Sequence, residues 1–147
     1  MIDNEDVLDF IRLLNHHEAR YLLVGGYAVI HYTEPRFTKD VDFYTDASRE
    51  NAARIVKVLT EFGIPENSIN LELFSTEENF FKLGRPPWRI DLITSLKGVN
   101  FNSLYENSQE IKIKEHAVRV VAKADLIRIK KIAGRPQDLI DVDKLEK

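Results

Sequence analysis

Apolar positions in the first part of the chain follow a helical pattern, then a strand pattern, then a helical pattern again. Over residues 4–17, apolar side chains recur every three or four positions, which predicts an amphipathic helix. The continuously apolar run 21–24 is typical of a central strand, and it stops at Gly25 and Gly26. Residues 27–32 are then expected to form a short helix that ends before Pro35. The pattern therefore predicts a strand-to-helix turn built on two glycines.

Residues 39–45 alternate between apolar and polar side chains, as expected for a strand with one buried face. Val41 and Phe43 fall on one face of this strand, whereas Asp40 and Asp42 fall on the other. Because residues two apart on a strand point the same way, the two carboxylates are expected to lie close together.

The rest of the chain alternates between the same two patterns. A helix is predicted over 48–61, strands over 79–83, 88–94, 110–114 and 117–121, and two final helices over 123–133 and 137–146, whereas 67–78 is ambiguous. The first two strands are expected to form a hairpin through 84–87, and the last two form either a second pair or one kinked strand. We therefore expect one α+β domain over residues 1–147, with a small mixed sheet covered mainly on one face by helices. A helical pair over 123–146 would close that domain.

Composition narrows the class of protein. The chain has 147 residues, with 21 Lys and Arg against 24 Asp and Glu, no cysteine, and a formal charge of −3. The absence of cysteine excludes disulfides and thiolate metal sites, and it suits a reducing, cytoplasmic setting. The uncharged run 21–30 is far shorter than the roughly 20 residues of a membrane span, so no membrane partner is expected. The mildly acidic charge argues against broad electrostatic capture of nucleic acid, although a local basic groove is compatible with it.

Two features of the first half of the chain carry candidate chemistry. At the Gly25-Gly26 turn, the free N–H groups at the start of a helix favour an anion. In Asp40-x-Asp42, the adjacent negative charges repel one another unless a cation such as Mg²⁺ lies between them. Each feature alone also fits a simpler interpretation, which is ordinary turn geometry for the glycines and a solvated strand face for the acids.

A third acid lies within a later strand. Asp91 interrupts the apolar segment 90–93 and takes the opposite face from Ile90 and Leu92. Taken alone, Asp91 is most simply interpreted as the partner of Arg89 or a nearby lysine in a salt bridge. Together with a glycine turn before a helix and a strand with paired acids, it describes a site for a nucleoside triphosphate.

At these positions the chain resembles the nucleotidyltransferase superfamily that includes DNA polymerase beta. The family pattern combines an apolar residue, Gly, and Gly or Ser with a following Asp-x-Asp or Asp-x-Glu and a later Asp. It corresponds here to Val24-Gly25-Gly26, Asp40-Val41-Asp42 and Ile90-Asp91. The likeness is strongest to small bacterial and archaeal members, which include minimal nucleotidyltransferases, antibiotic nucleotidyltransferases and abortive-infection toxins. It extends through residues 36–42, 125–130 and 134–139. Gly26 stands where many members have Ser, so phosphate contact there would depend on backbone N–H groups.

The resemblance implies a polymerase beta-like fold and transfer of an NMP from an NTP to an acceptor, with release of pyrophosphate. Asp40 and Asp42 would bridge two Mg²⁺ ions, with Mn²⁺ as the alternative metal, and Asp91 would ligate the second ion and take the nucleophile's proton. The acceptor is open among a protein, a tRNA and a small molecule. The likeness to abortive-infection toxins further implies a toxin–antitoxin component, and a partner protein or a homodimer would supply acceptor-binding surface.

Lys130 and Thr38 are further candidates for nucleotide binding, beside Gly25 and Gly26. Lys130 lies on the apolar side of the helix 123–133, where a lysine either extends to solvent or meets an anion. Because the resembling families carry a phosphate-contacting lysine near this position, Lys130 is expected to contact the nucleotide. Thr38 flanks the acidic strand, where it either contacts phosphate or packs within the loop.

Other polar residues have simpler interpretations. The four histidines show no metal-ligand spacing, so each is interpreted as structural or exposed. Asp138 and Asp141, near the start of the last helix, are interpreted as acids that the helix dipole favours.

Two functions other than nucleotidyl transfer fit parts of the pattern. One is a non-enzymatic module that binds a nucleotide or metal on the same fold. The other is a structural α+β protein, which predicts no Mg²⁺-dependent rise in thermal stability.

Overall fold

The computed structural model describes residues 2–84 and 88–147. Its elements, in chain order, are α1 (Glu5–His16), β1 (Tyr21–Val24), α2 (Gly25–Tyr32), β2 (Asp40–Thr45), α3 (Arg49–Phe62), the 3₁₀ helix η1 (Glu66–Ser68), α4 (Leu71–Ser75), β3 (Phe80–Leu83), β4 (Arg89–Ile93), α5 (Phe101–Asn107), β5 (Gln109–Ile113), β6 (His116–Val120), α6 (Lys123–Ala133) and α7 (Pro136–Leu145). The predicted hairpin joins β3 and β4, although residues 85–87 of its turn lie outside the described residues.

The strands form one mixed sheet in the order β3-β4-β2-β1-β6-β5. Strands β3 and β4 pair antiparallel, so the predicted hairpin is confirmed, and β5 and β6 also pair antiparallel, so of the two alternatives for 110–121 the strand pair forms rather than one kinked strand. At the centre, β1 runs antiparallel to β2 and parallel to β6, while β2 runs parallel to β4. The predicted α+β class with a small mixed sheet is confirmed.

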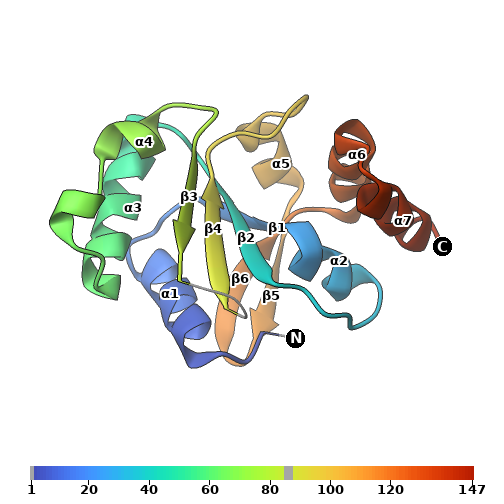
Figure 1. Cartoon of the computed structure of the whole chain (residues 1–147), viewed down its shortest axis with the longest axis horizontal. Helices are drawn as coiled ribbons and strands as arrows, with labels where there is room; N and C mark the ends of the chain where they lie inside the picture. The colour runs from blue at the N-terminus through green and yellow to red at the C-terminus, as the bar shows by residue number, and fades with distance from the viewer. Residues whose placement is uncertain (1, 85–87) are drawn as a thin grey trace.

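One face of the sheet packs against α1 and α3. The ring of Phe10 in α1 lies 6.0 Å from the ring of Phe43 in β2 and 5.2 Å from that of Phe62 in α3. Val41 and Phe43 are both fully buried. The alternation of β2 therefore directs its apolar side chains into the core beneath these two helices, which lie on the left of the sheet (Figure 1).

The opposite face carries Asp40 and Asp42, and helices cover it only in part. Tyr44 of β2 packs edge-on against Phe101 of α5, with 5.1 Å between the ring centroids. Leu126 of α6 lines a cavity together with Asp42. Helices α2, α6 and α7 lie together on the side of the sheet away from α1 and α3 (Figure 1). The acidic residues of β2 therefore lie beside a hollow rather than beneath a continuous helical layer.

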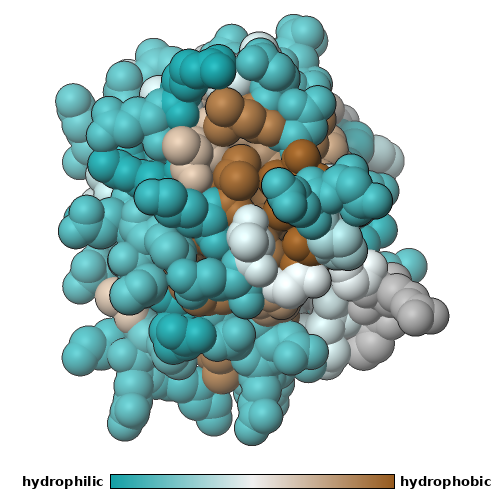
Figure 2. All heavy atoms as spheres, turned by 90° about the vertical axis from the view of Figure 1, so that its left-hand side faces the viewer, coloured by the Kyte–Doolittle hydropathy of each residue, from teal (hydrophilic) through white to brown (hydrophobic). Residues whose placement is uncertain are grey.

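The ambiguous segment 67–78 contains part of η1 and the short helix α4. Phe74 of α4 is buried and packs against the ring of Phe81 in β3 at 5.3 Å, so this segment forms helix because it covers the edge of the sheet. A hollow of about 630 Å³ lies where this segment meets α3 and is lined by Ala53, Val56, Lys57, Thr60, Glu66, Ile69 and Leu71. Figure 2 shows apolar surface gathered in a depression on this side of the molecule, within a polar surround.

Within residues 2–84 and 88–147, no helix combines the length and the apolar character that crossing a bilayer requires.

Candidate active site

Two neighbouring parallel strands bring the three predicted acids together. In the register of β2 with β4, Asp42 lies opposite Asp91 and Asp40 lies opposite Arg89. Residues opposite one another in adjacent strands point to the same face of the sheet. One carboxylate oxygen from each of Asp40, Asp42 and Asp91 lies within 4.8 Å of the others. This acid triad is an arrangement of hard oxygen donors that suits Mg²⁺.

A single guanidinium group neutralises part of the triad. The Arg89 side chain donates from Nε to Asp91 Oδ1 at 3.0 Å and from Nη2 to Asp40 Oδ2 at 2.9 Å. The simpler interpretation of Asp91, a salt bridge to Arg89, is therefore confirmed. The same arginine also donates a hydrogen bond to Asp40. The second oxygen of Asp40, Oδ1, is buried and has no hydrogen-bond partner among the described residues. Arg89 thus pairs with two of the three carboxylates, while Asp42 has no hydrogen-bonded cation and one acceptor atom of Asp40 is unsatisfied among the described residues.

The electrostatics of Asp42 reflect this deficit of positive charge. Burial raises the pKa of Asp42 to about 7, and the neighbouring charges of Asp91 and Asp40 act in the same direction. Lys130 opposes the shift only weakly. In the absence of a cation, Asp42 therefore keeps its proton at a pH where an ordinary aspartate is ionised. A divalent ion bound there would favour the ionised carboxylate and so oppose the shift, and these residues fit such an ion.

Gly25 and Gly26 are required by close approach to the acid strand. Gly25 has a φ of 69°, and a Cβ atom there would lie 2.1 Å from Asp42 Oδ2. A Cβ atom at Gly26 would lie 2.6 Å from Thr38 Oγ1. The residue before the helix, Val24, provides no side-chain cap for α2. The first N–H groups of α2 therefore start beside Asp42 and Thr38, where an anion would meet them.

Lys130 is brought to the same place by α6. A cavity of about 140 Å³ is lined by Val24, Gly25, Asp42, Ile93, Leu96, Leu126, Ile129, Lys130, Ala133, Arg135 and Asp138. Within it, Lys130 Nζ lies 3.2 Å from Asp138 Oδ1 and 3.0 Å from Asp141 Oδ2. The predicted lysine therefore borders the triad, but its charge is shared with two carboxylates. Its contact with a nucleotide stays a prediction.

The structure revises the interpretation of the acids in α7. Asp138 and Asp141 are buried, and their partners are basic side chains rather than the helix dipole alone. Asp141 accepts hydrogen bonds from Arg36, and Asp138 accepts one from Arg135 Nε at 2.7 Å. Burial favours the protonated form of Asp141, but hydrogen bonds from Arg36 and Lys130 outweigh it and lower its pKa. These contacts join α6, α7 and the 33–39 loop.

Arg135 is the residue at this site that the sequence analysis missed. Its side chain is 76% exposed and borders the cavity beside Asp42. It lies just before Pro136, within the stretch 134–139 that carries the family resemblance. A basic residue at the N-terminal boundary of a helix, where acids are usually favoured, is the sequence signal that points to it.

One histidine cluster also escaped the spacing argument, because its third member comes from another helix. Ligand atoms of His16, His17 and Glu61 lie within 4.8 Å of one another. His17 Nε2 lies 3.0 Å from Glu61 Oε1, a pairing that is ionic when the imidazole is protonated.

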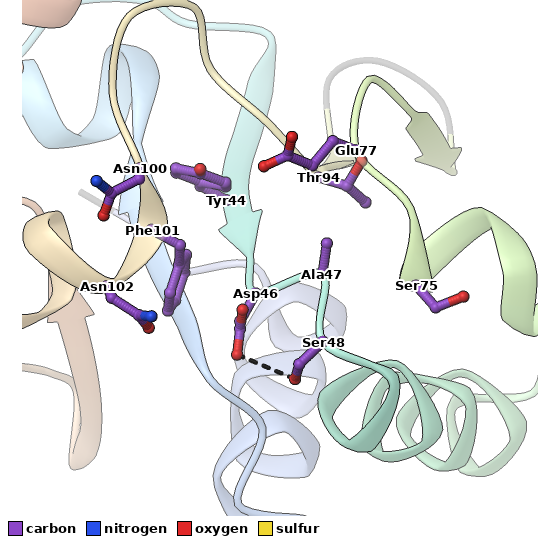
Figure 3. A pocket seen from close by; sticks show the side chains of 10 residues that line it. All are labelled: Tyr44, Asp46, Ala47, Ser48, Ser75, Glu77, Thr94, Asn100, Phe101 and Asn102. Atoms are coloured by element: carbon purple, nitrogen blue, oxygen red, sulfur yellow. Dashed lines mark hydrogen bonds between the residues drawn. The ribbon is translucent and has the colours of Figure 1, made fainter.

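A larger hollow of about 520 Å³ lies at the other end of β2, beyond Tyr44. Figure 3 shows Asp46 and Glu77 among its lining side chains. Asp46 accepts a hydrogen bond from Ser48 at 3.1 Å and pairs with Arg20 at 3.3 Å. None of the triad lines this hollow, so its acids are not part of the same group.

The family of the chain follows from sequence comparison. Residues 5–146 match the profile of the family described as nucleotidyltransferase of unknown function (DUF6036). The chain belongs to this nucleotidyltransferase family. The resemblance inferred from the glycine and aspartate motifs is thereby confirmed, and membership assigns nucleotidyl transfer as the class of reaction. No curated protein matches the chain in sequence.

Solved structures share the fold of this family member at low sequence identity. The lincosamide antibiotic adenylyltransferase LnuA, solved with lincomycin, is 15% identical, with a TM-score of 0.63 and coverage of 99% of this chain and 98% of LnuA. The candidate nucleotidyltransferase TM1012 of Thermotoga maritima is 15% identical, with a TM-score of 0.64 and coverage of 94% and 88%. ANT(2")-Ia, in complex with adenylyl-2"-tobramycin, is 12% identical, with a TM-score of 0.59 and coverage of 95% and 84%. At these identities the likeness shows a common fold.

Proposed function

We propose that the protein transfers an NMP from an NTP to an acceptor hydroxyl at the acid triad, with Mg²⁺ as the metal and Mn²⁺ as the alternative. One observation carries the proposal: Asp40, Asp42 and Asp91 converge within 4.8 Å, with Arg89 as their only hydrogen-bonded cation among the described residues. Three oxygen donors with a net negative charge suit hard divalent ions. Asp40 and Asp42 would hold two ions, and Asp91 would complete the ligand set of the second. Bound there, such ions would neutralise phosphate charge and lower the pKa of the attacking hydroxyl.

The chain's own residues would orient the substrate. The triphosphate fits the N–H groups at the start of α2, because Gly25 and Gly26 allow close approach beside Asp42 and Thr38. Lys130 and Arg135 would supply positive charge along the cavity that Asp42 borders. Asp91 would accept the proton of the acceptor hydroxyl as its oxygen attacks the α-phosphorus in line with the departing pyrophosphate.

The acceptor and the biological setting belong to the same proposal. LnuA and ANT(2")-Ia are named with antibiotics, which supports a small-molecule acceptor as one class. The motif resemblance to abortive-infection toxins supports a toxin–antitoxin component that modifies a protein or a tRNA in the cytoplasm. We propose that residues 1–147 act as one domain, and that a partner protein or a second copy supplies further acceptor-binding surface.

The proposal is tested by transfer of label from α-phosphate-labelled NTPs. Purified protein, each NTP and Mg²⁺ are incubated with cell extract, and labelled RNA, protein and small molecules are separated. We expect labelled product and released pyrophosphate with the parent protein, and neither with Asp40→Asn. Asp143→Asn, whose side chain is 72% exposed, serves as the matched control and should behave as the parent.

Calorimetry beside the transfer assay separates the enzyme from a non-enzymatic binding module. A module would bind Mg²⁺-NTP in calorimetry without releasing pyrophosphate. An Asp40→Asn variant that transfers label as fast as the parent would show that the triad does not perform the reaction.

A further inference from the structure

The acid face of the sheet continues past the triad onto the edge strand β3. In the register of β3 with β4, Lys82 lies opposite Asp91 and Phe80 lies opposite Ile93. Asp91 in turn lies opposite Asp42 of β2. Because opposed residues share a face, Lys82 and Phe80 point to the same side of the sheet as the triad. Adjacent strands lie about 4.8 Å apart, so this part of β3 borders the reacting centre.

Helices leave this part of the face uncovered. Phe80 is 48% exposed, and the Nζ atom of Lys82 lies 5.2 Å from the centroid of its ring. The alternate residues of the strand point the other way, with Phe81 packed against Phe74 of α4 and Leu83 buried. Among residues 2–84 and 88–147, Lys82 forms no ion pair with a carboxylate. The edge strand therefore presents an aromatic ring and a cation to solvent beside Asp91.

The geometry of the proposed reaction indicates that this surface lies on the side from which the acceptor approaches. In the proposed function, on which this inference rests, the triphosphate lies against Gly25 and the start of α2, which follow β1. Attack in line with the leaving pyrophosphate requires the acceptor to approach from the opposite side of the α-phosphorus. The strand order β3-β4-β2-β1 sets that opposite side at β4 and β3. Ile93 lines the nucleotide cavity and is the register partner of Phe80, so the exposed surface of β3 lies one strand away from that cavity.

We propose that Phe80 and Lys82 bind the acceptor, and that the acceptor is the end of a single-stranded nucleic acid. A base stacks on the exposed ring of Phe80, and a backbone phosphate pairs with Lys82. The terminal hydroxyl then lies at Asp91. Its oxygen forms a new bond to the α-phosphorus of the NTP, the bond from that phosphorus to the pyrophosphate oxygen breaks, and the hydroxyl proton passes to Asp91. Pyrophosphate leaves with the bonding electron pair.

The ring of Phe80 and the charge of Lys82 together favour a nucleic-acid acceptor over a polycationic small molecule and over a protein hydroxyl. Stacking on an aromatic side chain tolerates any base, and the lysine complements the phosphate that follows it. A polycationic small molecule would meet like charge at Lys82, and a serine or tyrosine hydroxyl of a protein would have no phosphate to pair with it.

Fluorescence anisotropy of a dye-labelled, short single-stranded oligoribonucleotide tests the proposal, in parallel with Mg²⁺-NTP binding by calorimetry. Phe80→Leu should weaken oligonucleotide binding about tenfold, whereas Phe80→Tyr, which keeps the ring, should bind as the parent does. Lys82→Gln should weaken binding and reduce the slope of log affinity against log salt by about one. Lys112→Gln, an exposed lysine on the opposite edge strand β5, is the matched control and should change neither quantity.

The calorimetric arm separates this inference from the proposed function. The Phe80 and Lys82 variants should bind Mg²⁺-NTP as the parent does, since neither side chain lines the nucleotide cavity. Failure of the parent to bind Mg²⁺-NTP would overturn the proposed function. Normal Mg²⁺-NTP binding with no oligonucleotide affinity, or with equal affinity in Phe80→Leu and Phe80→Tyr, would overturn the inference alone.

Discussion

The protein buries carboxylates in two places that differ in the positive charge around them. Between α6 and α7, Asp138 and Asp141 share Lys130, and each has an arginine of its own. In the triad, Asp40 and Asp91 share Arg89, whereas Asp42 and Asp40 Oδ1 have no hydrogen-bonded cation among the described residues.

The charge balance of each cluster explains its electrostatics. The pKa values of Asp138 and Asp141 are lowered, because hydrogen bonds from basic side chains outweigh burial. The pKa of Asp42 is raised by burial and by the neighbouring acids. The ionised Asp138 and Asp141, whose charges are balanced by basic side chains, hold α6 and α7 together. The triad has too little positive charge beside it and is stable only with a bound proton or cation. Carboxylates in clusters therefore have different roles, according to how many basic side chains lie beside them.

The largest expected difference between the clusters is in catalysis. In the proposed reaction, Asp91→Asn would remove a metal ligand and the proton acceptor while keeping the shape of the side chain, so we expect the transfer rate to fall by about 10³-fold or more. Pyrophosphate release under steady-state conditions measures it, and urea unfolding should show that the fold is retained. A variant with the parent's rate would remove Asp91 from the reaction.

In the α6–α7 cluster the corresponding change should act on stability. Asp141→Asn leaves Lys130 and Arg36 with less negative charge at a site where the aspartate side chain is fully buried. We expect the free energy of unfolding to fall by about 3 kcal/mol. Urea denaturation monitored by Trp88 fluorescence or circular dichroism measures it. An unchanged midpoint would show that this cluster contributes nothing to docking of α7.

Removal of the shared arginine should change the affinity of the triad for metal. Arg89→Gln eliminates the cation that lies between Asp40 and Asp91, so Mg²⁺ no longer competes with it for those oxygens. Because the Arg89 side chain is 26% exposed, solvent screening limits the effect, and we expect Mg²⁺ to bind about tenfold more tightly. Isothermal titration measures the affinity. Weaker binding in Arg89→Gln would indicate that the arginine orients the ligands instead of competing with the ion.

The smallest effect is on the stability of the metal-free protein. The folded-state pKa of Asp42, about 7, lies above its ordinary value of 3.8, so the folded state holds this proton more tightly than the unfolded state. Stability from this group is present below about pH 4 and is lost as pH rises towards 7. Asp42→Asn should therefore stabilise the metal-free protein at about pH 8 and have little effect at about pH 4. Urea unfolding at the two pH values measures the difference, and destabilisation at the higher pH would contradict it.

Local pattern was enough to predict the elements that position the triad. The alternation of 39–45 predicted which face of β2 carries Asp40 and Asp42, because strand periodicity requires no knowledge of neighbours. The glycine turn followed in the same way from two residues that tolerate unusual backbone geometry and close contacts.

Contacts that depend on register and on helix docking were not accessible from the pattern. The pairing of Arg89 with Asp40 requires the parallel register of β2 and β4. Arg36 reaches Asp141 only because α7 packs near the 33–39 loop. The helix α4 depends on the burial of Phe74, whose partner Phe81 lies on a strand that follows it. Each of these was missed for the same reason, since one partner becomes a neighbour only after folding.

Thermal unfolding against Mg²⁺ concentration, at about pH 8 and about pH 5, tests the central claim most directly. If the triad lacks a cation, saturating Mg²⁺ should raise the Tm of the parent by about 5 °C at the higher pH. The rise should be smaller at the lower pH, where the ion must displace the proton of Asp42, and absent in Asp91→Asn. A parent protein whose Tm does not respond to Mg²⁺, or a response that Asp91→Asn shares, would contradict the account.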